Sequence, residues 1–408
     1  MSYLFDHVDF DKTVKDYEFT RMAARSVEEA LSSSDLAGMD AAAIYSFLLS
    51  RMQNVSFKDY LKRYLYEHTD FGAPFSGVPE SDYMETILAS FEQNRAPRSF
   101  SPTTVRFRTA VTRWLRQDSV RRETVFLLGF GLRMPAEDVS DFLTKVLLEV
   151  DYLPDDPWEV ICWYSFSKGL SYADAAALGR FYEDCVVSSA NDPLFRKGEK
   201  IAVRMTAPEE TPADWAGYLH TEEEIRSVLY CLKKTGTAEH RRRSLREKFL
   251  ELYEECLGLI REIYRADETR KPDETAVGSA DLERMLCDGM PVTTRGNRRK
   301  VASSFLNDMF RQKRVTRQRL ESLLKGELEI DRFDLITLQF FLSSQSDEED
   351  GRLRCRYFLD DVNYVLENCG LRDIYPANPY EAFVTMCMAT EDPLENYCEV
   401  WKLSYEDN

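Results

Sequence analysis

The chain has 408 residues, a formal net charge of −18 at pH 7, and 44% hydrophobic and 12% aromatic residues. A chain of this length and composition can bury a sizeable core, which excludes global disorder. Its first residues lack the basic start and apolar core of a signal peptide. No uncharged apolar run reaches the ~20 residues that span a bilayer. We therefore predict a cytoplasmic protein that does not enter the membrane.

Cysteine and histidine give no sign of a chemical centre. The nine cysteines include no Cys-x-x-Cys pair, and the four histidines have no partner at metal-ligand spacing. We expect reduced thiols, no metal and no cofactor. Carboxylates are abundant, but no His or Cys is placed to identify an acid/base pair, so no catalytic residue can be named. The chain is therefore predicted not to be an enzyme.

Helical signals begin in the N-terminal part of the chain. Asp40 can cap a helix that carries apolar residues on one face, and Ser56 with Asp59 forms a capping-box variant before another helix. Two Gly and two Pro in 69–80 predict a loop, and helical spacing of apolar residues follows in Ser81–Gln93. From about Thr103 a further helix is expected to bury Val111, Trp114 and Leu115, which places its arginines on other faces.

The chain also contains an internal repeat, in which 119–184 returns as 331–407. The stretches Arg122–Leu132 and Arg332–Leu342 correspond at an offset of 210, with Ser119 and Asp331 as expected N-caps. Each copy later starts a helix with a cap, a proline and a glutamate, and then starts a last helix from a second cap. The residues are Asp156, Pro157 and Glu159 against Asn378, Pro379 and Glu381, then Ser171 with Asp174 against Asp392 with Glu395. The matching cap chemistry indicates two copies of one helical module.

The segment between the copies predicts an insert and a linker. Residues 188–212 read as polar and irregular, with a short β-prone piece at Ile201–Met205, and helices are expected from Thr221 and over Arg241–Tyr264. The charged stretch Glu268–Ser279 contains Pro and Gly and is predicted to be a linker. No sheet pattern is evident. The predicted division is 1–98 as an N-terminal helical segment, 99–185 as the first module, 186–267 as the insert, 268–280 as the linker and 281–408 as the second module.

Positive charge is concentrated in two stretches of this acidic chain. Residues 294–325 carry ten Lys/Arg against two acids, a local +8, which leaves −26 for the rest. Residues 101–132 carry six Arg against two acids, a milder +4. Both stretches end at or just before the repeated helix, so they occupy equivalent places in the two modules.

The capped helix with Phe57, Tyr60 and Leu61, and the later helix that ends Gly-Phe-Gly-Leu-x-Met at Met134, resemble the Xre family. These are λ-repressor-like helix-turn-helix proteins of Firmicutes, and the Asp-Pro-Trp-Glu segment is similar to extensions of uncharacterised clostridial members. The resemblance covers about half of the chain. In the second copy it implies a first helix at Val301–Phe310, a recognition-like helix at Thr316–Leu324 and a closing helix at Arg332–Leu342. The first copy departs from the family pattern, because some thirty residues stand where the tight helix-turn-helix belongs.

The sequence therefore predicts an all-α protein with two tandem Xre-like modules joined by a helical insert. The leading hypothesis is a non-enzymatic bacterial regulator of transcription that binds double-stranded DNA through an Xre-like helix-turn-helix module. Basic side chains would contact the DNA phosphates and base edges. The candidate contacts are Lys313, Arg314, Arg317, Arg319, Lys325, Arg298, Arg299, Lys300, Arg106, Arg113 and Arg116. The bland alternative is that the basic run is a solvated face paired with neighbouring acids.

A second hypothesis is an acidic interaction adaptor that keeps the helical fold without binding DNA. Its partner would be a basic protein or a second copy of the chain. The −26 outside the basic stretch favours this alternative.

Overall fold

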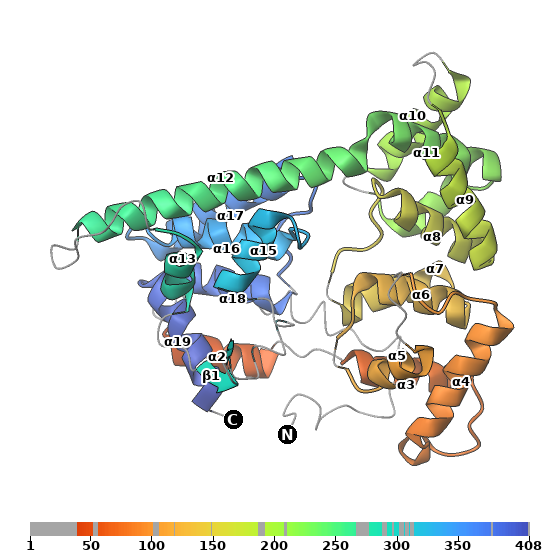
Figure 1. Ribbon diagram of the computed structural model, residues 1–408, viewed down its shortest axis with the longest axis horizontal. Helices are drawn as coiled ribbons and strands as arrows, with labels where there is room; N and C mark the ends of the chain where they lie inside the picture. Colours follow the sequence, from red (N-terminus) through yellow and green to blue (C-terminus); the bar gives the residue numbers. More distant parts are fainter. Residues whose placement is uncertain are drawn as a thin grey trace. The chain divides into compact units, whose positions relative to one another are not determined.

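The computed structural model describes residues 39–51, 56–100, 106–117, 119–147, 149–186, 192–207, 210–266, 277–287, 292–295, 298–301, 306, 310, 314–376 and 378–406. In these residues the fold is all-α apart from one two-stranded antiparallel hairpin (Figure 1). The predicted fold class is therefore confirmed. The hairpin was not expected from the sequence.

The first compact unit contains α3 to α11 and the start of α12. Its helices are α3 (Phe57–His68), α4 (Glu80–Gln93), α5 (Phe107–Trp114), α6 (Arg122–Leu132), α7 (Ala136–Asp141), α8 (Pro157–Lys168), α9 (Tyr172–Asp184), α10 (Pro193–Met205) and α11 (Glu222–Thr235). Short turns of other helix types lie at η3 (Phe75–Gly77), η4 (Phe142–Val146) and η5 (Pro212–Gly217). Its core includes Phe57, Tyr60 and Phe142, whose rings meet edge to face.

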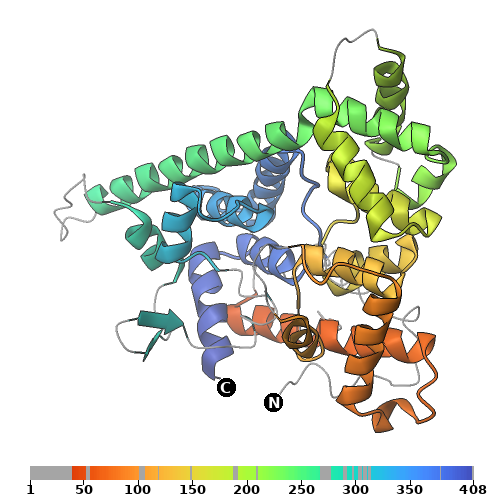
Figure 2. The ribbon, with the colours of Figure 1, turned by 45° about the vertical axis from the view of Figure 1, so that its right-hand side comes forward.

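The second unit contains α2 and the chain from the greater part of α12 onward. Its elements are α2 (Ala41–Arg51), α12 (Thr237–Ala266), α13 (Ser279–Leu286), β1 (Val292–Arg295), β2 (Arg298–Val301), α15 (Arg317–Lys325), α16 (Arg332–Ser343), α17 (Gly351–Asn368), α18 (Pro379–Met388) and α19 (Pro393–Glu406). Figures 1 and 2 show α12 as the long helix along this unit. It buries Phe249, Leu252, Cys256 and Ile260 at helical spacing in the core.

Helix α2 shows that the predicted N-terminal segment 1–98 does not form one body. Asp40 caps α2 as expected, by accepting a hydrogen bond from the Ala43 amide at 2.8 Å. Ile44 and Leu48 are fully buried, but in the core of the second unit, where α2 contacts α18 and α19. The predicted insert 186–267 is likewise divided between the units. Sequence periodicity specifies which face of a helix is buried, and it does not specify the partner.

Two local predictions were wrong. The β-prone piece Ile201–Met205 is the end of α10, in which Ile201 and Met205 are buried at helical spacing. Ser119 does not cap the repeated helix, because α6 starts at Arg122 and has Arg121 at its N-cap position, without a capping side chain. The linker predicted at 268–280 lies mostly outside the described residues, and α13 begins inside its last residues.

An arginine at the start of α6 fastens that helix to the loop before α8. The Arg122 guanidinium donates to both carboxylate oxygens of Glu159, each at 2.6 Å, and to the carbonyl oxygens of Val150 and Asp151. Glu159 also accepts a hydrogen bond from the Leu153 amide at 2.8 Å. We call this network the first clasp. Because Glu159 is buried, the clasp neutralises a charge inside the unit.

The second unit contains a clasp with the same donors and acceptors. Arg332, at the start of α16, donates to both oxygens of Glu381 at 2.9 and 2.8 Å and to the carbonyl oxygens of Arg372 and Asp373. Glu381 accepts from the Tyr375 amide at 2.7 Å. The two glutamates, their loop carbonyls and their amide donors all correspond at an offset of 222. This equivalence supports the internal repeat, which remains a prediction about the origin of the two modules.

Candidate nucleic-acid interface

The recognition-like helix predicted at Thr316–Leu324 corresponds to α15 in the second unit. Thr316 accepts a hydrogen bond from the Arg319 amide at 3.2 Å, and Gly326 ends the helix in a left-handed conformation with φ +74°. Leu320 and Leu323 are buried. The closing helix predicted at Arg332–Leu342 is α16, with Asp331 as its cap. The first helix expected at Val301–Phe310 lies mostly outside the described residues, and Val301 itself is in β2.

Two arginines of the basic run face inward. Arg319 donates through Nε and Nη2 to the two oxygens of Asp334, both at 2.7 Å, and Asp334 is buried. Arg314 is buried as well, where its Nε meets the Cys287 sulfur at 3.3 Å and its Nη1 donates to the Tyr405 hydroxyl at 3.0 Å. The Arg319 guanidinium neutralises a buried carboxylate, and the Arg314 guanidinium is packed in the interior of the unit. We therefore remove Arg314 and Arg319 from the predicted DNA contacts.

The remaining basic side chains of the second unit differ in what they offer. Arg317 is exposed but pairs with Glu321 one turn later, at 2.6 Å. Lys325 is exposed, and no ion pair is found for it among the described residues. Most of β2 is formed by Arg298, Arg299 and Lys300, and its ladder places Lys300 opposite Thr293 and Arg299 opposite Thr294. The side chains of these three residues, and Lys313 as a whole, lie outside the described residues. Of the described basic side chains of this run, Arg317 and Arg319 are thus paired with carboxylates of the same unit.

Helix α5 of the first unit presents a basic face to solvent. Val111, Trp114 and Leu115 are buried as predicted. Arg106, Thr109, Arg113 and Arg116 are exposed. Thr109 and Arg113 lie on one side of the helix, Arg106 is its N-cap residue, and Arg116 follows its C-cap Leu115. We call these four residues the α5 face.

Two of the three arginines of the α5 face keep their charge available. Arg116 pairs with Glu80 of α4 at 2.8 Å, and both side chains are exposed. Within the described part of the chain, the Arg106 and Arg113 side chains have neither a hydrogen bond nor an ion pair. Within the described residues both charges are thus left for a ligand, and a guanidinium in this state can bind a phosphate group.

Three further arginines near α5 were not singled out by the sequence. Arg95 and Arg98 follow α4, and Arg108 lies in the first turn of α5; all three are exposed. The run from Arg95 to Arg122 holds eight arginines against the single acid Asp118, which is more concentrated than the 101–132 stretch that we counted. A count of charged residues that began at the end of α4 would have included Arg95 and Arg98.

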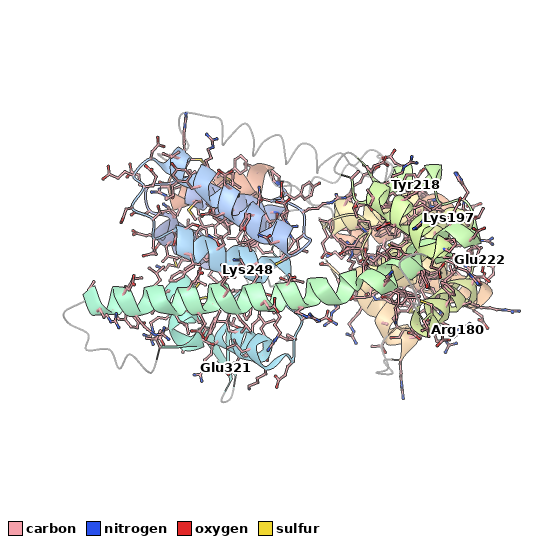
Figure 3. All side chains as sticks on the ribbon, turned by 90° about the horizontal axis from the view of Figure 1, so that it is seen from above. Arg180, Lys197, Tyr218, Glu222, Lys248 and Glu321 are labelled. Atoms are coloured by element: carbon pink, nitrogen blue, oxygen red, sulfur yellow. The ribbon has the colours of Figure 1, made fainter. Side chains whose placement is uncertain are left out.

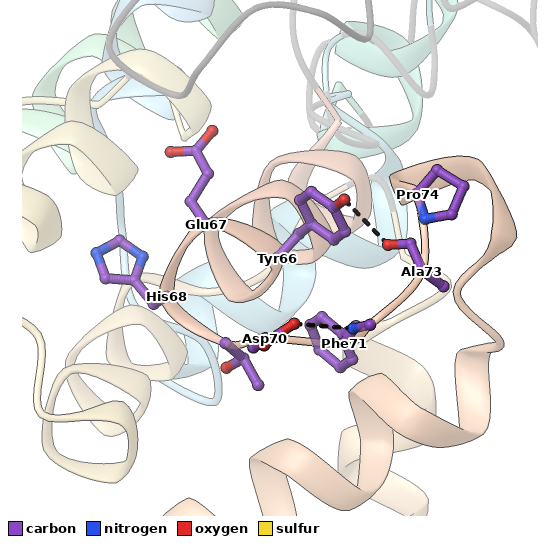
Figure 4. A pocket seen from close by; sticks show the side chains of 9 residues that line it. Tyr66, Glu67, His68, Asp70, Phe71, Ala73 and Pro74 are labelled. Atoms are coloured by element: carbon purple, nitrogen blue, oxygen red, sulfur yellow. Dashed lines mark hydrogen bonds between the residues drawn. The ribbon is translucent and has the colours of Figure 1, made fainter.

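Two other hollows of the first unit are lined by groups that pair locally. One is formed by the loop after α3, where Tyr66 donates to the Ala73 carbonyl at 3.0 Å and the Gly72 amide donates to Asp70 at 2.9 Å (Figure 4). The other is lined by α10 and by residues before α11, including Lys197 and Tyr218, labelled in Figure 3. Lys197 pairs with Glu223, and Tyr218 donates to Glu210. Neither hollow gathers charges of one sign without partners.

The thiols and imidazoles of the described residues have structural surroundings. Burial raises the pKa of the Cys355 thiol to about 12 and that of Cys162 well above its ordinary value, which keeps both protonated near neutral pH. His68 stacks on Tyr64 and shares a hydrogen bond with its carbonyl, and His220 does the same with the Gly217 carbonyl. In the described residues no group of three His, Cys, Asp or Glu could hold a metal ion.

Comparison with known proteins does not place this chain in a family: no family model, curated protein or solved structure matches it. None of the helices described has both the length and the apolar character needed to cross a bilayer. The functional argument therefore rests on the residues themselves, and the Xre resemblance remains a hypothesis.

Proposed function

We propose that this protein is a non-enzymatic regulator of transcription that binds double-stranded DNA through the α5 face. The observation that carries the proposal is the set of exposed side chains Arg106, Thr109, Arg113 and Arg116, opposite a buried apolar face. In helix-turn-helix proteins a helix lies in the major groove with its N-terminal residues on base edges, while other basic groups hold the phosphates. This face replaces the basic run around α15 as the leading candidate, because Arg314 and Arg319 of that run are committed to the core.

The position of α5 in the unit supports this function. It contacts α4, and α4 contacts α6. In the chain, α5 lies between α3 and α6, the two helices that the Xre resemblance matches. Arginine binds guanine edges and phosphates with its planar fork, and threonine hydroxyls can bond to either. A face of three arginines and a threonine thus provides both kinds of contact. The overall charge of −18 restricts binding to this region of the surface.

The proposal is tested by fluorescence anisotropy with random and genomic duplex DNA over a salt series. Three arginine–phosphate contacts give log K a slope of roughly −3 against log salt. The double variant Arg106→Glu/Arg113→Glu is expected to lose at least tenfold in affinity at low salt and to flatten that slope. Its matched control is Arg133→Glu/Arg180→Glu, which changes the same charge at two exposed arginines elsewhere in the unit; Arg180 is labelled in Figure 3. Equal losses in both double variants contradict a specific α5 face.

The alternative function, an acidic interaction adaptor, has its own observation in the second unit. Tyr357, Asp360, Asp361 and Tyr364 recur at i, i+3, i+4 and i+7 on α17, and the two tyrosines are 51% and 64% exposed. Exposed tyrosines are typical of protein interfaces, and the two aspartates suit a basic partner. The adaptor reading gains if the wild-type chain binds no DNA and a basic protein that co-purifies with it is lost in Tyr357→Ser/Tyr364→Ser. Retention of that protein by the variant removes this face from consideration.

A further inference from the structure

A second feature of the first unit is a hollow between the end of α4 and the start of α5. It has a volume of about 610 Å³. Four of its nine lining residues are arginines: Arg95 and Arg98 from the segment after α4, Arg106 at the N-cap position of α5, and Arg108 in its first turn. We call it the arginine hollow. It shares Arg106 with the α5 face, and its other residues are its own.

The charges of the arginine hollow are not balanced by the protein. Its four guanidinium groups face one carboxylate, that of Glu92, which leaves a formal +3. Among the described residues, none of the four arginine side chains takes part in a hydrogen bond or an ion pair. Like charges around one hollow repel one another, and a bound anion relieves that repulsion. Elsewhere in the unit, Arg122 and Arg116 are paired with carboxylates.

One wall of the arginine hollow is apolar. Phe107 is half-buried and packs against Phe91, with their ring centroids 4.8 Å apart, and Leu88 and Ala96 complete this side. A planar ring system of a ligand can lie against such a wall while its anionic part meets the guanidinium groups. The volume falls within the range of about 300–1,000 Å³ that is typical of small-molecule sites.

We propose that the arginine hollow binds a small polyphosphorylated ligand, a nucleoside di- or triphosphate, with its phosphates on the four arginines and its base against Phe107. A surplus of three positive charges matches a polyphosphate chain better than it matches a monoanion. Guanidinium groups bind phosphate oxygens in pairs of parallel hydrogen bonds, and four of them can hold two or three successive phosphates. The protein would then respond to a soluble nucleotide as well as to DNA.

The hollow shape separates this ligand from duplex DNA. A DNA backbone lies along an open surface such as the α5 face, whereas a cavity of this kind encloses a free, flexible phosphate chain. The two sites nevertheless share Arg106, so that a nucleotide in the hollow competes for one DNA contact. The nucleotide site does not depend on the DNA proposal, and either can fail alone.

Isothermal titration calorimetry on the full chain tests the site. ATP, GTP, tripolyphosphate, inorganic phosphate and adenosine are titrated separately at low salt, with a chelator present to keep the phosphates fully charged. We expect the nucleoside triphosphates to bind, tripolyphosphate to bind more weakly because it lacks a base, and adenosine not to bind. Added salt weakens binding, since the contacts are ionic. Absence of binding by both triphosphates overturns the proposal, and equal affinity of ATP and tripolyphosphate overturns its nucleoside part.

Variants then place the ligand. Arg95→Ala/Arg98→Ala/Arg108→Ala is expected to weaken triphosphate binding at least tenfold, because it removes three of four charge-assisted contacts. Arg133→Ala is the matched control, since Arg133, like Arg95, is an exposed arginine with a positive φ after a helix. Circular dichroism verifies that each variant is folded. If the triple variant binds the triphosphate with unchanged affinity, the ligand binds elsewhere and the proposed site is wrong. Arg113 lies outside the hollow, so Arg113→Glu should weaken DNA binding and leave triphosphate binding unchanged.

Discussion

Replacing Arg319 with alanine should reveal whether this arginine stabilises the core or serves the surface. Its partner Asp334 is 1% exposed and receives two guanidinium hydrogen bonds at 2.7 Å. Removing one member of a buried ion pair typically costs about 3–5 kcal/mol, because the other charge remains without compensation. With a urea dependence of about 2 kcal/mol per molar, the unfolding midpoint of the second unit falls by roughly 2 M.

The loss of stability in Arg319→Ala should depend on pH, because it depends on whether Asp334 is ionised. Burial first, and the charge of Asp331 second, raise the pKa of the Asp334 carboxyl to about 6, while Arg319 opposes that rise. A carboxyl whose pKa is raised by folding contributes stability below its unfolded pKa, near 4, and loses that contribution as the pH rises through 6. Without Arg319 the pKa rises further. The cost of Arg319→Ala should therefore be largest at pH 8 and should shrink at pH 5, where Asp334 can take up a proton.

Urea unfolding at pH 5 and pH 8, followed by circular dichroism, measures both quantities. Arg317→Ala is the control, because Arg317 and Glu321 form an exposed pair in the same helix, and we expect it to change stability little at either pH. A loss below ~1 kcal/mol for Arg319→Ala at pH 8 is what an exposed pair gives. That outcome, or an equal loss at both pH values, would refute the reasoning and return Arg319 to the list of surface contacts.

Two further predictions concern stability: one tests the two clasps, and the other tests the close packing at Gly198. Arg122→Ala and Arg332→Ala should each lower the free energy of unfolding by about 3–5 kcal/mol in thermal or urea unfolding, since each leaves a buried glutamate unpaired. A small effect in either unit would show that its clasp is dispensable. Gly198→Ala should destabilise α10 against α11 by about 1–3 kcal/mol, because its Cβ would lie 1.9 Å from the Ser227 carbonyl oxygen. Gly179→Ala is the matched change in α9, where the nearest atom is 3.7 Å away, and it should stabilise the helix by ~0.5–1 kcal/mol; a loss in both variants would mean that contact with α11 is not the cause.

Sequence reasoning succeeded where the deciding groups lie within one helical turn. The caps Asp156 and Asn378 each accept hydrogen bonds from the amides two and three residues ahead. Thr316 and Ser171 act in the same way over three residues. Such contacts depend on local geometry alone, so a short sequence pattern is enough to specify them.

It failed at α10, where the deciding contact is distant in sequence. The β-prone residues of Ile201–Met205 suggested a short extended piece. In the fold Gly198 faces the backbone of Ser227, where a side chain has no room, and the close approach of α11 that it permits stabilises the helix. The spacing Phe195, Gly198, Ile201 and Met205 is helical once the glycine is counted as part of the buried face.

The same limit explains why charge counting placed inward-facing and exposed arginines in one list of candidate contacts. Arg319 and Arg106 each belong to a basic stretch of the sequence. They differ in the structure, because a buried carboxylate lies beside Arg319 but not beside Arg106 within the described residues. Asp334 lies three residues after the predicted cap Asp331 and accepts a hydrogen bond from the Asp331 amide, and it stands 15 residues from the arginine that neutralises it. Near α5 no buried acid receives Arg106 or Arg113 within the described residues. A positive charge is available to a ligand only after the protein's own buried carboxylates have been paired, and for that reason the milder basic stretch provides the stronger candidate surface.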